Sequence, residues 1–203
     1  MPSETSYRIA FWVLIALTLT MRWYFIQAVR RSGGQVGPDQ DAIRREGKWL
    51  FVFRLLGGLT LAGLLALYAL LPEVVESLSI GLPGWLRWAG FGLGLVSLAF
   101  WTWVQVVLGM QWSAQLRLRQ EHHLITSGPY AIVRHPMYVA IVGFAVGLAV
   151  LTANTLFAIL ALLVIAGLVL RVPREEAMLQ ERFGAEYTTY ASQTGGLLPR
   201  LRR

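Results

Sequence analysis

Three long stretches of this chain contain no charged residue, and they run from 55 to 71, from 88 to 116 and from 137 to 170. A helix needs roughly 20 mostly apolar residues to cross the hydrocarbon core of a bilayer, so each stretch is long enough to supply most of a span. Only 14% of the 203 residues are charged, whereas soluble domains average about 25%. We therefore expect an integral, multi-pass membrane protein.

The apolar stretches predict five membrane-spanning helices. The uncharged run 137–170 would make a helix of roughly 50 Å, too long for one crossing of a ~30 Å core. Its polar cluster at 152–155 is therefore expected to form a tight hairpin between two short spans. The predicted spans cover residues 7–27, 49–71, 85–110, 137–151 and 155–170.

An amphipathic helix is expected after the last span, because Leu179, Phe183, Tyr187 and Tyr190 recur at spacings of four, four and three. The predicted fold class is all-α: a polytopic membrane bundle of about five transmembrane helices with a C-terminal amphipathic helix. We expect a single domain over 1–203. Its first part, 1–110, would be a three-span support, and 111–203 would hold a loop, a helical hairpin and the segment that carries the chemistry. The first apolar segment lacks a small-residue cleavage site and is expected to remain as a span.

The distribution of basic residues predicts the orientation. The first and third loops and the tail are rich in arginine, while the alternate loops and the N-terminus carry only Arg8 and Arg87 among their basic residues. Because basic residues collect in cytoplasmic loops, the N-terminus is expected outside and the C-terminus in the cytoplasm. The net charge of +7 falls in these connections rather than on one face, so nucleic acid is not an expected partner.

The loop before the fourth predicted span is rich in chemistry. Ser127-Gly128-Pro129-Tyr130 is a strong turn sequence, and Pro136 suits the first turn of a helix. Arg134 and His135 would then stand at a helix N-terminus, where free N–H groups can cradle a carboxylate or a phosphate. An ordinary interfacial turn with its usual arginine remains the alternative. His122 and His123 are adjacent and point apart, and the chain has no cysteine, so no metal site is expected.

A second stretch follows the last predicted span. Arg171 and Glu175 are four residues apart, which places them on one helical face unless Pro173 kinks the backbone between them. The simple interpretation is an ion pair at the lipid headgroups. A charge pair at the end of a span, across from an anion-binding turn, is also a candidate functional site.

Together these stretches resemble the isoprenylcysteine carboxyl methyltransferase family and the related membrane phospholipid methyltransferases, in the form of a short prokaryotic-type member. The chain differs from the family pattern after Tyr190. There the family tends to have a basic residue and then a proline before a closing Leu-Pro or Ile-Pro, whereas this chain has Gln193 to Gly196 before Leu197-Leu198-Pro199. The matching motifs, in the family's order, are Leu124 to Tyr130, Arg134-His135-Pro136-x-Tyr138, Glu175-Glu176, and Phe183-Gly184-x-Glu186-Tyr187-x-x-Tyr190.

The resemblance implies an enzyme that transfers a methyl group from S-adenosyl-L-methionine. It implies catalytic roles for Arg171, which would face the acceptor and orient a carboxylate, and for Glu176, which with Glu175 is a candidate base if the acceptor is a lipid amine. It also implies that the cofactor is bound by Gln115, His122, His123, Leu124, Ile125, Tyr130, His135, Pro136, Met137, Tyr138 and Glu175.

The expected acceptor is a lipophilic molecule, either the carboxylate of a prenylcysteine-like compound or a lipid amine, methylated at the cytoplasmic face. A prokaryotic cell membrane is favoured over the endoplasmic reticulum. Two alternatives stay open: an NADPH-dependent membrane reductase of the sterol type, and a non-enzymatic membrane scaffold. The altered tail leaves the acceptor atom unassigned.

Overall fold

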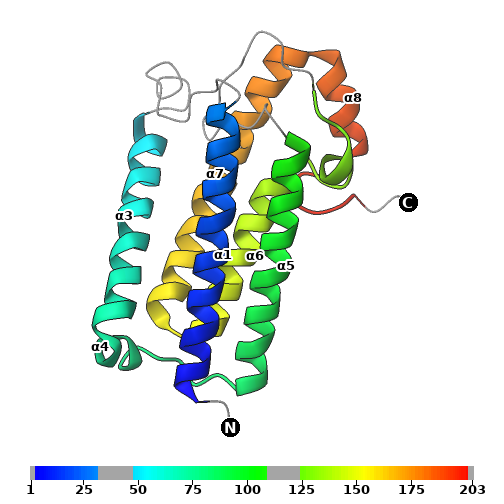
Figure 1. The fold of residues 1–203 in the computed structure, drawn as a ribbon. Coiled ribbons are helices and arrows are strands. Elements are labelled where there is room, and N and C mark those ends of the chain that lie inside the picture. The colour runs from blue at the N-terminus through cyan, green and yellow to red at the C-terminus, as the bar shows by residue number, and fades with distance from the viewer. Residues whose placement is uncertain (1–2, 32–47, 109–123, 201–203) are drawn as a thin grey trace.

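The computed structural model describes residues 3–31, 48–108 and 124–200. Gln115, His122 and His123, three of the predicted cofactor residues, lie outside these ranges. The described chain is helical and forms an elongated bundle (Figure 1). Its helices are α1 (Glu4–Arg31), α3 (Lys48–Leu70), the short α4 (Pro72–Glu76), α5 (Gly84–Leu108), the 3-10 turn η2 (Gly128–Ala131), α6 (Pro136–Thr152), α7 (Thr155–Phe183) and α8 (Ala185–Gln193).

Three of these helices, α1, α5 and α7, are long and apolar enough to cross a membrane. Two shorter apolar helices, 55–70 within α3 and Pro136–Thr152, stand beside them. At 1.5 Å per residue, α6 is roughly 25 Å long, slightly less than the hydrocarbon core. The predicted all-α polytopic bundle is confirmed, with its spans close to the predicted ranges.

The closest packing in the bundle is between α5 and α6, because small residues face one another across that contact. A Cβ atom on Gly90 would lie 2.7 Å from the backbone nitrogen of Leu151, and one on Gly147 would lie 2.8 Å from the carbonyl oxygen of Gly90. Such distances leave no room for a side chain. The two helices are thereby held backbone to backbone, and α6 is fixed against the long span α5.

The hairpin between α6 and α7 was predicted from its polar residues and is confirmed. Ala153 adopts a left-handed conformation (φ +46°) that ends α6. The side chain of Asn154 accepts a hydrogen bond from the backbone nitrogen of Leu156 (2.9 Å) and so caps α7. Its amide also donates to the carbonyl oxygen of Val75 (2.7 Å), which ties the hairpin to α4.

The C-terminal helix differs from its prediction. α7 continues through Pro173 as far as Phe183. The helix ends at Gly184, which has a φ of +52°, and α8 begins at the next residue. The expected single amphipathic helix through Leu179 and Tyr190 is therefore wrong, because a glycine in the left-handed region ends the helix in its middle. Figure 1 shows α7 extending past the other helices and turning back into α8.

Candidate active site

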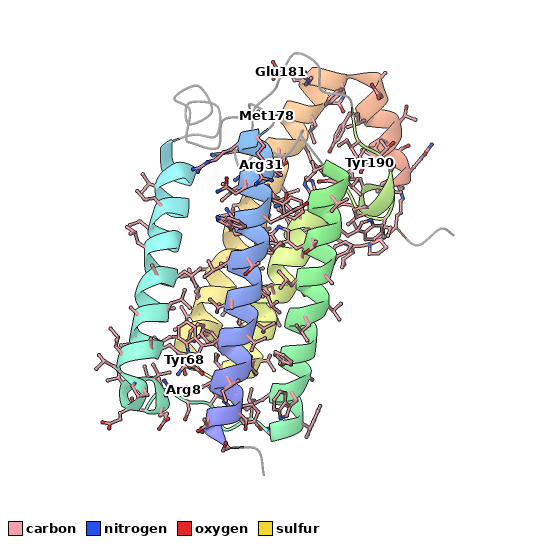
Figure 2. The ribbon with its side chains drawn as sticks, viewed as in Figure 1. Arg8, Arg31, Tyr68, Met178, Glu181 and Tyr190 are labelled. Carbon is pink, nitrogen blue, oxygen red and sulfur yellow. The ribbon has the colours of Figure 1, made fainter. Side chains whose placement is uncertain are left out.

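The residues of the sequence motifs gather at one end of the bundle, where α6 begins and α7 extends beyond the other helices. η2, the start of α6, the last turns of α7 and α8 lie together there (Figure 1). In Figure 2 the labelled Met178, Glu181 and Tyr190 mark this end, far from Arg8 and Tyr68 at the other. Residues 40 to 60 positions apart in sequence are thus brought into contact.

Arg134 and Glu176 form the central ion pair. Nη2 of Arg134 lies 2.6 Å from Oε1 of Glu176, and its Nε donates to the same oxygen at 2.9 Å. Nε2 of His135 is 3.2 Å from that oxygen as well. Partial burial raises the pKa of Glu176, but hydrogen bonds from Arg134 and His135 outweigh the burial and hold the pKa below its ordinary value. Glu176 is therefore an ionised carboxylate that is a poor base at neutral pH.

Glu175 lies next to this pair and is held by a different residue. The hydroxyl of Tyr138 donates to Oε2 of Glu175, and Nδ1 of His135 lies 3.8 Å from the same oxygen. The rings of His135 and Tyr138 are stacked, with centroids 5.4 Å apart and planes 14° from parallel. One buried histidine, 5% exposed, therefore stands between the two neighbouring carboxylates. The second oxygen of Glu175 makes no hydrogen bond to any residue that the structure describes.

The C-terminal tail, which follows α8 from Thr194 onward, is hydrogen-bonded to Arg134 and His135. Backbone nitrogens of Arg134 and His135 donate to the carbonyl oxygens of Gly195 (2.8 Å) and Gly196 (3.2 Å). Nη1 of Arg134 donates to the carbonyl oxygen of Thr194. A side chain at Gly195 would collide with the carbonyl oxygen of Leu198, so the tight turn of this tail requires glycine. The segment in which the chain differs from the family pattern is thus a structural part of the site.

These contacts change the expected role of the α6 N-terminus. It was predicted to cradle an anion, but the nitrogens of Arg134 and His135 are taken by the tail, and Pro136 has no N–H to offer. The guanidinium of Arg134 is likewise engaged by Glu176 and by backbone carbonyls. The N–H groups of Arg134 and His135 and the guanidinium of Arg134 thus bind the chain's own carbonyls and a carboxylate, so they are not the open anion cradle that the sequence predicted.

Three tyrosines surround the charged cluster. The hydroxyl of Tyr190 donates to the carbonyl oxygen of Tyr130 (2.6 Å), which fixes α8 against η2. Burial raises the pKa of Tyr190 to about 12 and raises that of Tyr130 further above its ordinary value. Tyr187 is almost fully buried, 3% exposed, and packs edge-on against Tyr190 at 6.1 Å between ring centroids. All three are therefore neutral groups that shape the site and cannot act as bases near neutral pH.

The other predicted site residues lie around this cluster. Pro136 is buried in the first turn of α6, and Met137 packs against the apolar core. Leu124 and Ile125 are half-buried just before η2. Because α7 is continuous through Pro173, Arg171 lies one helical turn before Glu175, on the same face. The predicted cofactor and catalytic residues that the structure describes thus lie on η2, α6 and α7 and in the segment just before η2.

Two parts of the site were not in the predicted set. The sequence predicted Arg134 as an anion ligand and as part of a family motif, and did not predict its ion pair with the Glu175-Glu176 doublet. The second part is the segment from Thr194 to Gly196. Its Gly-Gly pair is typical of a turn in which two backbone segments approach closely. Their long-range pairing, 60 residues away from Arg134, leaves no local pattern in the sequence.

Comparison with known proteins identifies the segment that builds this site. Residues 90–181 match the model of the isoprenylcysteine carboxyl methyltransferase (ICMT) family. This segment is similar to the ICMT family. The matched segment contains most of α5, all of α6 and α7 as far as Glu181, and so includes Arg134, His135 and both carboxylates of the site.

Curated proteins match over a similar length. Protein-S-isoprenylcysteine O-methyltransferase B of Arabidopsis thaliana is 39% identical over 83 residues, which are 40% of this chain and 42% of that protein. A probable protein-S-isoprenylcysteine O-methyltransferase of Oryza sativa subsp. indica is 36% identical over 97 residues, 46% of this chain and 51% of that protein. The chain thus aligns with about half the length of these relatives.

One further match has a different name. The nickel-cobalt-cadmium resistance protein NccN of Alcaligenes xylosoxydans xylosoxydans is 35% identical over 95 residues, 46% of this chain and 45% of that protein. Among solved structures, the eukaryotic intramembrane Ras methyltransferase ICMT superposes with a TM-score of 0.62 and 19% identity, covering 98% of this chain and 68% of that one. The whole bundle therefore has the ICMT membrane fold.

Proposed function

We propose that this chain is a membrane methyltransferase that transfers a methyl group from S-adenosyl-L-methionine to a lipophilic acceptor. The observation that carries the proposal is the cluster of His135, Tyr138, Glu175 and Glu176 at the start of α6 and the end of α7. It lies inside the segment that matches the ICMT family, on a bundle with the ICMT fold. A prenylcysteine-like carboxylate is the acceptor that the relatives' names suggest.

The donor set of the site fits the cationic and ribose parts of this cofactor. Glu175 lies at one edge of the cluster, with its side chain 25% exposed. Tyr138 holds one of its oxygens, and the other points to no described partner, so it can accept from ribose hydroxyls or from an ammonium. His135, Tyr138 and Tyr130 supply flat ring surfaces beside it. The cofactor, when bound, supplies a methyl group on a positively charged sulfur.

The chain's own contribution to the reaction is positioning. Methyl transfer is an in-line displacement, which depends mainly on alignment in a site shielded from water. Arg171, one turn before Glu175 and partly buried, is placed to orient an acceptor carboxylate. A carboxylate is already ionised at neutral pH and needs no base. This agrees with the lowered pKa of Glu176, whose role we assign to fixing Arg134 and His135 rather than to accepting a proton.

An apolar acceptor chain can reach Arg171 from the bilayer. Val169 and Leu170, the two residues before Arg171, are 49% and 68% exposed on the outside of α7. In a membrane this surface contacts lipid, so the acceptor's hydrocarbon could lie along it while its carboxylate meets Arg171. We propose that the site faces the cytoplasm of a prokaryotic cell, in accordance with the positive charge of its neighbouring loops.

The proposal is tested by methyl transfer in detergent. The purified chain, given S-adenosylmethionine labelled in its methyl group, should label an N-acetyl-S-prenylcysteine, and phosphatidylethanolamine should be offered in parallel as a lipid amine. Arg171→Ala should cut turnover by at least tenfold, while binding of S-adenosylhomocysteine stays within about twofold. Arg182→Ala, also on α7 but further from the α6 contact, is the matched control and should leave turnover unchanged.

Thermal unfolding distinguishes the alternatives. A ligand that binds only the native state raises the apparent stability, so S-adenosylhomocysteine should raise the midpoint and NADPH should not. Stabilisation by NADPH alone would favour a reductase and sink the proposal. Response to neither ligand would favour a scaffold that keeps the fold without the activity.

A further inference from the structure

A polar cavity lies at the opposite end of the bundle from the candidate active site. Its volume is about 320 Å³, which is near the lower limit for sites that bind small ligands. The ends of α1, α3, α4, α5 and α6 surround it, together with the loop that leads into α5. Four charged side chains line it: Glu4, Arg8, Glu76 and Arg87.

Two of these charges already neutralise each other. The guanidinium of Arg87 binds both carboxylate oxygens of Glu4, with Nη2 3.0 Å from Oε2. Its Nε donates to the carbonyl oxygen of Leu151 at 3.0 Å, and its charge lies 3.7 Å above the ring of Tyr7. Three N–H groups of Arg87 therefore hold α1, α5 and α6 together, and Glu4 balances its charge. Arg87 lines the cavity as a cation that is already paired.

Arg8 and Glu76 are the charges that remain. Nη2 of Arg8 donates to the carbonyl oxygen of Tyr68 (2.9 Å), which fixes the side chain and leaves the rest of its five N–H donors available. Figure 2 shows Arg8 beside Tyr68 at this end of the bundle. Glu76, the last residue of α4, lines the same cavity. In the part of the chain that the structure describes, the two line one cavity without forming an ion pair with each other.

The depth of the cavity in the membrane indicates which kind of ligand it binds. Trp85 and Trp88, in the first turn of α5, flank Arg87 in sequence, and Trp85 is 72% exposed. Tryptophan collects at the membrane–water interface, so this end of α5 lies among lipid headgroups. A cation and an anion that line one cavity are complementary to a headgroup that carries a phosphate and an amine.

We infer that this cavity binds the phosphoethanolamine headgroup of a bilayer lipid. Arg8 binds the phosphodiester through its remaining N–H groups, and Glu76 accepts hydrogen bonds from the protonated amine. The ligand is held on the side of the membrane opposite to the candidate active site, so it acts as a bound structural lipid that fastens α1 to α4. A methyl-transfer substrate would have to occupy the other end.

The test measures thermal unfolding of the detergent-purified full chain with three additives: dioctanoyl-phosphatidylethanolamine, dioctanoyl-phosphatidylglycerol and glycerophosphoethanolamine. The ethanolamine lipid should raise the midpoint by about 2–4 °C, since a stabilisation of about 1 kcal/mol has that effect in a chain of this size. Phosphatidylglycerol, which has no amine, should raise it by less than half as much. A weaker shift with glycerophosphoethanolamine than with the lipid would identify the bilayer as the source of the ligand.

Variants assign the shift to the cavity. Arg8→Gln and Glu76→Gln should each remove most of the shift given by the ethanolamine lipid, while Glu73→Gln, on the same short helix but outside the cavity lining, should keep it. Glu76 is exposed, and an exposed glutamine costs little stability, so its variant remains informative even if Arg8→Gln unfolds. An undiminished shift in Glu76→Gln, or an equal shift with phosphatidylglycerol, would overturn the inference.

Discussion

The two ends of the bundle are built around similar arginines that have different neighbours. Arg87 and Arg134 each bind a glutamate far away in sequence, 83 and 42 residues distant, and each also donates to backbone carbonyls. At the Arg87 end the glutamate is on the first turn of α1, and its side chain is 59% exposed. At the Arg134 end the glutamate is 29% exposed and shares its oxygen with His135.

This difference shows that Arg87 has a structural role, whereas Arg134 belongs to the candidate active site. Arg87 ties three helix ends together, and its glutamate does nothing else among the residues that the structure describes. Arg134 instead binds Glu176 and the C-terminal tail, while the adjacent Glu175 is half-buried and is held at one oxygen by Tyr138. A second carboxylate beside a satisfied pair is what a cationic ligand requires.

The largest effect is expected from Arg134→Met. It leaves Glu176 partly buried without its partner and frees the carbonyls of the tail, which should cost about 3 kcal/mol of unfolding free energy. Chemical unfolding in detergent measures this loss, and methyl transfer should disappear with it. A variant with native stability would show that the tail holds the site without Arg134.

Gly195→Ala tests the tail itself. The new methyl group would collide with the carbonyl oxygen of Leu198, so the turn has to open. We expect a loss of about 2 kcal/mol, typical of overpacking, together with weaker binding of S-adenosylhomocysteine. Gly196→Ala is the control, because the nearest atom to a Cβ there is the end of the Arg134 side chain at 3.6 Å. Equal effects of the two changes would argue against a specific turn at Gly195.

Arg87→Met should be milder than Arg134→Met. Its glutamate is already exposed and can be solvated, so the cost is the loss of the bond to Leu151 and of the contact with Tyr7, about 1.5 kcal/mol. Methyl transfer per folded molecule should not change, since this end lies away from the cluster. Loss of turnover without loss of stability would contradict the separation of the two ends.

The smallest effect is a pH dependence. Because the pKa of Glu176 is held below its ordinary value of 4.5, its ion pair stabilises the native state at pH values above the ordinary glutamate range. This contribution is lost as the pH falls through the lowered pKa. The stability difference between the wild type and Glu176→Gln should therefore be full at pH 7 and shrink toward pH 3. A difference that grows on acidification would contradict the lowered pKa.

Much of the fold follows from local patterns, and the arrangement of the site does not. Apolar runs gave the spans, and the polar residues around Asn154 gave the hairpin, because burial in lipid and turn chemistry act within a few residues. The break at Gly184 comes from a local backbone conformation that the side-chain spacing does not reveal. The hydrogen bonds from Arg134 to the tail carbonyls join segments about 60 residues apart. The Glu175-Glu176 doublet could be found in the sequence. Only the structure separates the two carboxylates into one paired with arginine and one held by tyrosine.

The central claim is that Glu175 binds the methyl donor, and one binding measurement tests it most directly. Calorimetric titration of S-adenosylhomocysteine into the wild type, Glu175→Gln and Glu181→Gln compares the site carboxylate with an exposed glutamate of the same helix (Figure 2). We predict at least tenfold weaker binding in Glu175→Gln, about 1.4 kcal/mol, and unchanged binding in Glu181→Gln. Equal affinity in Glu175→Gln and the wild type would contradict the claim.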